Sequence, residues 1–165
     1  MVKKLIIAVI LIVAAAAVYF VFFSESEEQK IRKMLNGLCM DCAKNKESSS
    51  AAALIVKTNV LKSYFTDPCT LSVYRGFLQG TFNDVRIANE IMRVNLFFRE
   101  SDLSYSDLIV TVNVPEATAS FTGRFQAVLK SGERVDEVRE VDLKLRKVEK
   151  KWKITSAEVH KILQR

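Results

Sequence analysis

The sequence contains little glycine, proline or histidine, and each shortage narrows the class of protein. Five glycines and two prolines in 165 residues leave few points where a helix or strand must break, so we expect long regular elements. The single histidine, His160, and the lack of an HExxH motif or an aspartate-rich loop argue against a catalytic metal site. We therefore predict neither a metal nor another cofactor.

The sequence also lacks a block of like charge and an internal repeat. Its net charge is +6, but two of its 25 basic residues, Lys3 and Lys4, precede the apolar run described below. The rest of the chain holds 23 basic residues against 19 acidic ones, spread along its length. A balance this modest argues against nucleic acid as a partner.

One long apolar run is present, at residues 5–23. It contains only Leu, Ile, Ala, Val, Tyr and Phe. Its nineteen residues would form a helix of about 28 Å, close to the roughly 30 Å hydrocarbon thickness of a bilayer. Because a helix satisfies its own backbone hydrogen bonds, we predict one transmembrane anchor helix within residues 1–23.

The charges beside this run predict its orientation. Lysines collect on the cytoplasmic side of a span, and here Lys3 and Lys4 precede the run while the acidic segment 24–28 follows it. Residues 24–165 should therefore form a single domain outside the cytoplasm, in the periplasm if the source is Gram-negative. A cleaved secretory signal is the alternative, because the small residues 14–17 offer a cleavage site.

Three helices are expected in the first half of this domain. Apolar residues recur at helical spacing over residues 25–44 and 51–64, and again up to residue 98. Ser50 is placed to cap the second helix, and Thr81 with Asp84 resembles a capping box for the third. The segment 69–77 alternates weakly and fits either a short strand or an irregular arm.

From Tyr105 the apolar period changes from 3.6 to 2, which predicts strands. They are expected at residues 105–114, 119–129, 135–146 and 152–159. Short connections between them favour a four-stranded antiparallel meander with one buried face. Val138 is out of phase with Val141, and we interpret this as a bulge or bend in the third strand.

Helices followed by a curved antiparallel sheet make an α+β fold. The order of elements, with the terminal motif Lys151-Trp152-Lys153-Ile154-Thr155, resembles the nuclear transport factor 2-like superfamily, also called SnoaL-like or cystatin-like. The resemblance covers residues 25–163 and implies three helices on a four-stranded sheet that curls into a cone with a pocket. Relatives include SnoaL-type polyketide cyclases, ketosteroid isomerases and membrane-anchored bacterial domains.

The resemblance also implies what a pocket in this fold can hold. The family's enzymes place an acid or a histidine in the pocket, often beside a tyrosine. No residue aligns with such a motif, although Asp67, Asp102, Asp107 and His160 are available, so we assign no catalytic residue. The aromatic residues considered as pocket lining are Tyr64, Tyr74, Tyr105 and Trp152.

Three cysteines give the most specific local pattern, a C-x-x-C formed by Cys39 and Cys42, with Cys69 as a third thiol. The pair lies near the C-terminal end of the first predicted helix, where the helix dipole disfavours a thiolate, so a thioredoxin-like role is disfavoured. In an oxidising compartment Cys39 or Cys42 can form a disulfide with Cys69. Three free thiols are the alternative, and a zinc site that adds His160 is numerically possible.

A basic cluster occurs late in the chain. The solvated face and turn of the last strands explain it, and attraction to anionic headgroups or an acidic partner is the alternative. Its members are Lys144, Arg146, Lys147, Lys150, Lys151 and Lys153.

The function expected from these observations is binding. We predict a non-enzymatic, single-span membrane protein whose outer domain binds a partner protein, a second copy of itself or a small apolar ligand, in an envelope assembly. The alternative is a small isomerase- or cyclase-type enzyme that uses a pocket acid or tyrosine. An apolar pocket would favour the first hypothesis, and a converging acid, histidine or tyrosine would favour the second.

Overall fold

The computed structural model describes residues 25–44, 50–73 and 78–160. The predicted anchor at residues 1–23, its orientation and Tyr74 lie outside these residues. Within the described ranges, no helix combines the length and apolar character needed to cross a bilayer.

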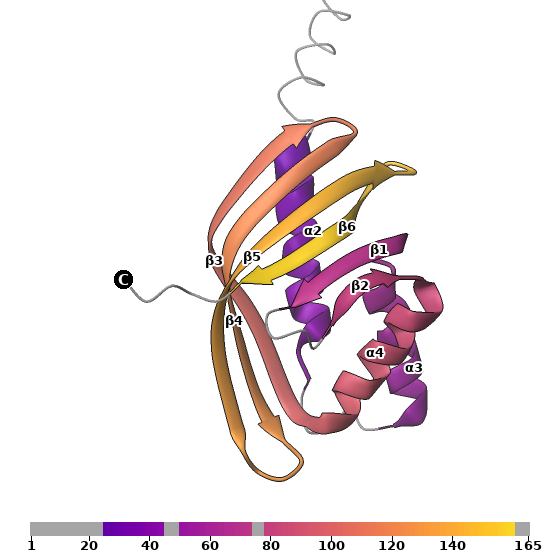
Figure 1. Cartoon of the computed structure of the whole chain (residues 1–165), viewed down its shortest axis with the longest axis vertical. Helices are drawn as coiled ribbons and strands as arrows, with labels where there is room; N and C mark the ends of the chain where they lie inside the picture. Colours follow the sequence, from indigo (N-terminus) through magenta and orange to yellow (C-terminus); the bar gives the residue numbers. More distant parts are fainter. Residues whose placement is uncertain (1–24, 45–49, 74–77, 161–165) are drawn as a thin grey trace, which may run out of the picture.

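The three predicted helices are confirmed (Figure 1). They are α2 (Glu27–Cys42), α3 (Ala51–Lys62) and α4 (Asp84–Phe97). Ser26 forms a capping box with Gln29 at the start of α2, and Ser50 caps α3 as predicted. The cap of α4 is Asn83 rather than the predicted Thr81, because the Asn83 side chain accepts a hydrogen bond from the backbone N–H of Arg86.

The sheet has six strands, so the prediction of four was wrong. The strands are β1 (Phe65–Val73), β2 (Gln79–Phe82), β3 (Phe98–Asn113), β4 (Glu116–Leu129), β5 (Arg134–Val148) and β6 (Lys151–His160), in the spatial order β2-β1-β6-β5-β4-β3. The predicted antiparallel meander is β3 to β6. The short strand considered at residues 69–77 corresponds to β1, which starts earlier, whereas β2 was not predicted. The parallel pairing of β1 with β6, Val73 beside Val159, was not predictable because the two strands are distant in the chain.

The irregularities of the sheet lie elsewhere than predicted. The pairing of β4 with β5 runs without a shift from Glu116–Arg146 to Val128–Arg134, so β5 has no bulge at Val138. In a regular strand Val138 simply points to the opposite face from Val141. Register shifts occur instead between β5 and β6 at Lys144 and Leu145, and in β3 between Ser106 and Ile109.

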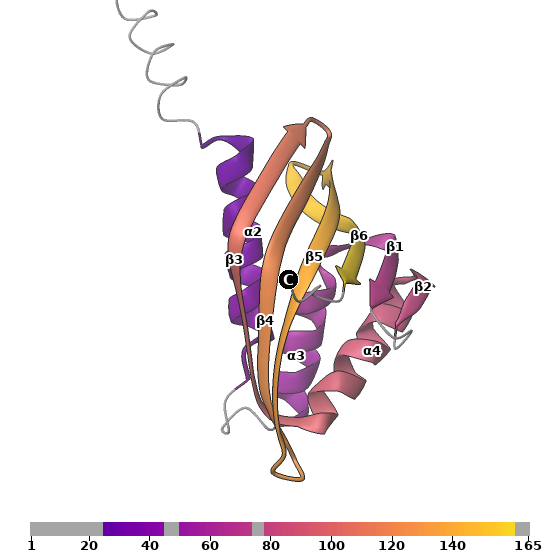
Figure 2. The same cartoon turned by 60° about the vertical axis from the view of Figure 1, so that its left-hand side comes forward.

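All three helices lie on the same side of the curved sheet (Figure 2). On that side Ile31 and Leu35 of α2 join a buried cluster with residues of the sheet. The sheet residues of this cluster include Leu143, Leu145, Trp152 and Ile154. Burial of these side chains fixes α2 against the upper half of the sheet and leaves α3 and α4 to cover the other half (Figure 1).

Candidate functional site

An apolar cavity of about 230 Å³ lies between α3, α4 and the sheet. The helices contribute Leu61, Ile87, Ile91 and Val94 to its wall. The strands and their connections contribute Phe65, Leu71, Leu78, Phe98 and Phe125. Because α4 leads directly into β3 at Phe98, the helix and the sheet diverge from this junction and leave room between them.

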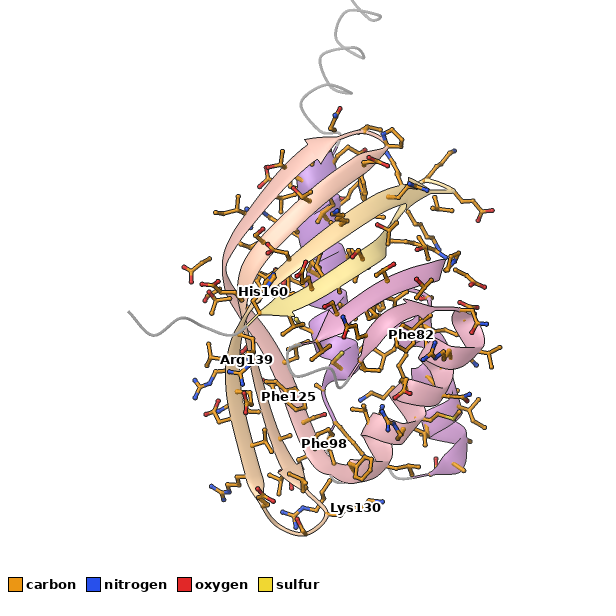
Figure 3. The ribbon with its side chains drawn as sticks, viewed as in Figure 1. Phe82, Phe98, Phe125, Lys130, Arg139 and His160 are labelled. Atoms are coloured by element: carbon orange, nitrogen blue, oxygen red, sulfur yellow. The ribbon has the colours of Figure 1, made fainter. Side chains whose placement is uncertain are left out.

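Two phenylalanines shape one end of the cavity. Phe98 at the start of β3 and Phe125 of β4 pack edge to face, with ring centroids 5.3 Å apart and an interplanar angle of 73°. Both lie where the sheet approaches α4 (Figure 3). This end therefore offers aromatic edges and faces to a ligand.

The polar side chains in the wall are Cys42, Glu90, Asn95 and Ser101. Asn95 Nδ2 donates to the Ile91 carbonyl at 2.9 Å, and Ser101 Oγ donates to the Cys42 carbonyl at 3.2 Å. Glu90 accepts a hydrogen bond from Arg93 at 2.9 Å. Each of these three side chains thus has an intramolecular partner, and the wall favours an apolar ligand over a polar one.

The thiol of Cys42 contributes no reactive group to the cavity. Burial, followed by the neighbouring Cys39 thiol, raises the pKa of Cys42 to about 11. The thiol therefore stays protonated at neutral pH, and a protonated thiol is a poor nucleophile.

Two lysines near the end of α2 donate hydrogen bonds to backbone carbonyl groups beside this wall. Lys44 Nζ donates to the carbonyls of Asn95 and Phe98, both at 2.7 Å, and Lys57 Nζ donates to the carbonyl of Ala43 at 2.6 Å. These carbonyls follow or end helices and have no helical partner of their own. Burial lowers the pKa of both lysines. No local pattern of residues predicts this arrangement, because it depends on contacts between distant segments.

Of the predicted pocket aromatics, the three that the structure describes, Tyr64, Tyr105 and Trp152, do not line the apolar cavity. Tyr105 donates to Asn36 Oδ1 at 2.6 Å, and Tyr64 donates to Asp41 Oδ2 at 2.6 Å. Burial, followed by the bond to Asp41, raises the pKa of Tyr64 to about 12. Trp152 Nε1 donates to Glu27 Oε2 at 2.8 Å and is 5% exposed. The sequence did not predict the residues that do line the cavity. Leu, Ile, Val and Phe side chains at a cavity cannot be distinguished from core residues in a sequence.

Tyr64 and Trp152 instead line a second recess, of about 330 Å³, beside α2 and the turn between β5 and β6. Its other lining residues are Lys30, Met34, Ser63, Lys150 and Lys151. This recess shares no lining residue with the apolar cavity. A third recess, of about 520 Å³, lies beside β3, β4 and β5, and its wall includes the charged residues Lys44, Asp102, Arg134 and Asp136.

The acids and the histidine considered from sequence also lie away from the apolar cavity. His160 Nε2 is 3.0 Å from Asp142 Oδ2 in an exposed cluster, and Ser120 Oγ donates to the other oxygen of Asp142 at 2.5 Å. The serine bonds the carboxylate rather than the imidazole, so the cluster lacks the order of a catalytic triad. Asp67, Asp102 and Asp107 are absent from the wall of the apolar cavity, and Asp102 lines the third recess instead.

The three cysteines are free thiols in this structure. Cys69 is fully buried in the core, and burial alone raises its pKa to about 11. A disulfide from Cys39 or Cys42 to Cys69 stays a prediction for the oxidised protein. Within the described ranges, no group of three or more His, Cys, Asp or Glu side chains is arranged to hold a metal ion.

No protein-family model matches this sequence, and no curated protein matches it either. Solved structures do match. A candidate aromatic ring hydroxylase from Novosphingobium aromaticivorans has a TM-score of 0.68 at 14% identity, over 86% of this chain and 94% of that one. A candidate scytalone dehydratase from the same species has a TM-score of 0.64 at 18% identity, over 81% and 82%.

A third solved structure is described by its fold. It is a nuclear transport factor 2-like protein with a cystatin-like fold, also from Novosphingobium aromaticivorans, with a TM-score of 0.63 at 15% identity, over 92% of this chain and 90% of that one. Identities this low establish the fold alone. The chain has the nuclear transport factor 2-like α+β fold, as its order of elements predicted.

Proposed function

We propose that this chain is a binding domain of the nuclear transport factor 2-like superfamily that takes a small apolar ligand into the cavity between α4 and the sheet. The observation that carries the proposal is the wall of that cavity. Its surface is made largely of Leu, Ile, Val and Phe side chains, and Asn95, Ser101 and Glu90 are bonded within the chain. A neutral ligand with a flat or branched apolar body fits this chemistry.

The proposal includes a tether to the membrane. Residues 1–23 would span the bilayer, and α2 begins only a few residues later, at Glu27. The cavity wall includes Cys42, the last residue of α2, so the cavity would then lie at the end of α2 away from the bilayer. The domain would be outside the cytoplasm, because Lys3 and Lys4 precede the span.

Ligand binding can be tested residue by residue with indole, a small neutral aromatic, added to the full chain in nanodiscs. We expect the methyl resonances of Ile87 and Ile91, which line the cavity, to shift in a saturable manner. Ile109 is 69% exposed on β3, outside the cavity wall, and its methyl resonances should not move. Shifts that appear equally at Ile109 would contradict the proposal.

A matched pair of variants sharpens this test. Val94 is 40% exposed and lines the cavity, whereas Val85 on the same helix is 69% exposed and does not. Val94→Trp should fill the cavity and weaken indole binding by about tenfold or more, since roughly 1.4 kcal/mol of lost contact already gives a factor of ten. Val85→Trp adds the same side chain and should leave binding unchanged.

An enzyme of the isomerase or cyclase type is the second candidate. It is favoured by the two solved neighbours described as a candidate hydroxylase and a candidate dehydratase. Glu90 is the acid in the cavity wall and would be the group to carry proton transfer. If a compound extracted with the protein is turned over, and Glu90→Gln abolishes that turnover while still binding the compound, the enzyme hypothesis replaces the binding one.

A protein partner, or a second copy of the chain, in an envelope assembly is the remaining candidate. Its support is the apolar outer surface of the helices: Ile55 and Val56 of α3 are 58% and 62% exposed, and Phe97 of α4 is 59% exposed. Crosslinking of the full chain in its membrane, followed by identification of the captured proteins, tests this candidate. Recovery of lipid and bulk proteins alone would remove its support.

A further inference from the structure

The second recess, beside α2 and the turn between β5 and β6, has a basic rim over an aromatic floor. Lys150 and Lys151 are exposed at the turn. Trp152, the next residue in the sequence, also lines the recess and is 5% exposed. Lys30 of α2 lies on the other side. The volume of about 330 Å³ is larger than a simple anion needs.

Lys30 is paired with Glu27, but the positive charge of the two turn lysines is not neutralised by the carboxylates around the recess. Glu27 accepts hydrogen bonds from Lys147 and Trp152, both at 2.8 Å, and from Lys30 at 2.7 Å. Asp41 accepts from Tyr64 at 2.6 Å. Among the described residues, the ammonium groups of Lys150 and Lys151 have no ion-pair partner. Glu149 precedes them in the turn but is not part of the recess wall.

The backbone of the turn is a second, independent observation. Glu149 and Lys150 form the two-residue connection between β5 and β6, with φ of 49° and 68°. Both angles lie in the left-handed region, for which such turns normally use Asn-Gly. A lysine therefore occupies a position that favours glycine, and this residue is part of the recess wall. Strained residues of this kind often coincide with binding positions.

We propose that this recess binds a phosphate-bearing group, supplied either by a soluble phosphate ester or by the headgroup of an anionic phospholipid. Lysines act as mobile point charges toward phosphate, and several ammonium groups can donate to the oxygens of one phosphate. The remaining volume accommodates the body attached to the phosphate, against Met34, Tyr64 and Trp152.

The position of the recess supports the lipid source. Glu27, the first residue of α2, contacts Trp152 and Lys147, so the recess lies beside the start of α2. Figure 1 shows the start of α2 at the same end of the domain as the turn between β5 and β6. If residues 5–23 span a bilayer, as proposed above, the same end of the domain faces the headgroups. The recess and the apolar cavity share no residue, so either proposal can fail without the other.

Trp152 makes the test direct, because it is the only tryptophan of the chain and lies in the recess wall. The full chain in an uncharged maltoside detergent is titrated with glycerol phosphate and with short-chain phosphatidylglycerol while its tryptophan fluorescence is recorded. Sodium chloride at matched ionic strength is the blank. We expect a saturable change with the phosphate compounds and none with the blank.

Three variants distinguish the loss of a specific lysine–phosphate contact from a folding defect and from an effect of net charge. Lys150→Gly removes one ammonium group and suits the positive φ, so the fold should not suffer. Lys151→Gln removes the second ammonium group. Each should weaken binding by about tenfold, as expected for loss of a charge-assisted contact. Lys153→Gln removes one charge from the same strand outside the recess wall and should bind as the parent does.

The outcomes are distinct. Tighter binding of phosphatidylglycerol than of glycerol phosphate identifies the lipid headgroup as the source, and equal binding identifies a soluble ester. The absence of a saturable change with both compounds overturns the proposal. It is also overturned if Lys153→Gln weakens binding as much as Lys150→Gly, because the effect would then be one of net charge.

Discussion

Glu27 receives polar contacts from three side chains on two sides of the domain. Its carboxylate is bonded to Lys147 of β5, to Lys30 one turn along α2 and to the indole N–H of Trp152. The bonds to Lys147 and Lys30, in that order, lower the pKa of Glu27 from 4.5 to about 2, against a smaller opposing effect of burial. The residue therefore joins the start of α2 to the sheet mainly in its charged form.

This contact should depend on pH in a defined window. Because the pKa of Glu27 is lower in the folded chain, its contribution to the free energy of unfolding is complete above about pH 5 and is lost as the pH falls toward 2. Urea unfolding of the parent and of Glu27→Gln should give stabilities that differ most above pH 5 and converge near pH 2. A difference that does not change with pH would contradict the assigned pKa.

Gly37 marks a close approach between α2 and the segment after α3. A Cβ at this position would lie 2.8 Å from Tyr64 Oη, the oxygen that donates to Asp41. Gly37→Ala should gain about 1 kcal/mol of helix propensity but disturb a hydrogen bond to a charged group worth about 1.5–3 kcal/mol. The net expectation is a loss of about 1 kcal/mol, measured by urea unfolding.

The effect of Gly37→Ala on the stability of the fold should change from a loss to a gain when Tyr64 is replaced by phenylalanine. Without the hydroxyl, the nearest ring atom lies 3.7 Å from the added Cβ, which is ordinary contact. On the Tyr64→Phe background Gly37→Ala should therefore stabilise the fold by about 0.5–1 kcal/mol. The same loss on both backgrounds would mean that Gly37 is required for another reason.

At the scale of elements, the turn between β5 and β6 carries strain that a substitution can remove. Glu149 and Lys150 both adopt positive φ. Replacing them with Asn-Gly should stabilise the domain by about 1–2 kcal/mol, because each residue in the left-handed region costs about 1 kcal/mol. Thermal unfolding measures the gain, and the same change at Ser131-Gly132, whose glycine already has a φ of 94°, is the control with little expected gain.

The helices and the meander were predictable because their signals are local. The apolar period and some of the caps depend on neighbouring residues alone, as Ser50 at the start of α3 illustrates. The strand β1 was predicted only in part, as one of two alternatives for residues 69–77, because its parallel partner β6 lies far along the chain, at Val159 for Val73. The early start of β3 at Phe98 was hidden by the polar segment that follows it.

The candidate site was predictable only in its chemistry. An apolar pocket was one of two expectations, but its lining residues, such as Ile87 and Phe125, have the same composition as the core. Tyr64 and Trp152 were expected at a pocket and line the basic recess instead. Their positions depend on the bonds to Asp41 and Glu27, which join distant segments and leave no pattern in the sequence.

At the scale of the whole molecule, the proposed function depends on whether residues 5–23 anchor the domain in a membrane and on which side the domain then lies. If residues 5–23 span the bilayer with Lys3 and Lys4 inside, an epitope tag fused after Arg165 is exposed on the outside. Protease added to sealed bacterial spheroplasts should remove the tag completely while a cytoplasmic marker protein stays intact. Protection of the tag until the spheroplasts are lysed would show the opposite topology.

The two lysines provide the matched variant for this experiment. Replacing Lys3 and Lys4 with glutamate removes the positive charge that keeps the N-terminus inside, so a part of the population should insert in the reverse orientation or fail to insert. The tag should then become partly protected. An N-terminal tag on the parent chain separates anchoring from cleavage: it stays joined to the domain if residues 5–23 are an anchor, and it is lost if they are a signal cut near residues 14–17.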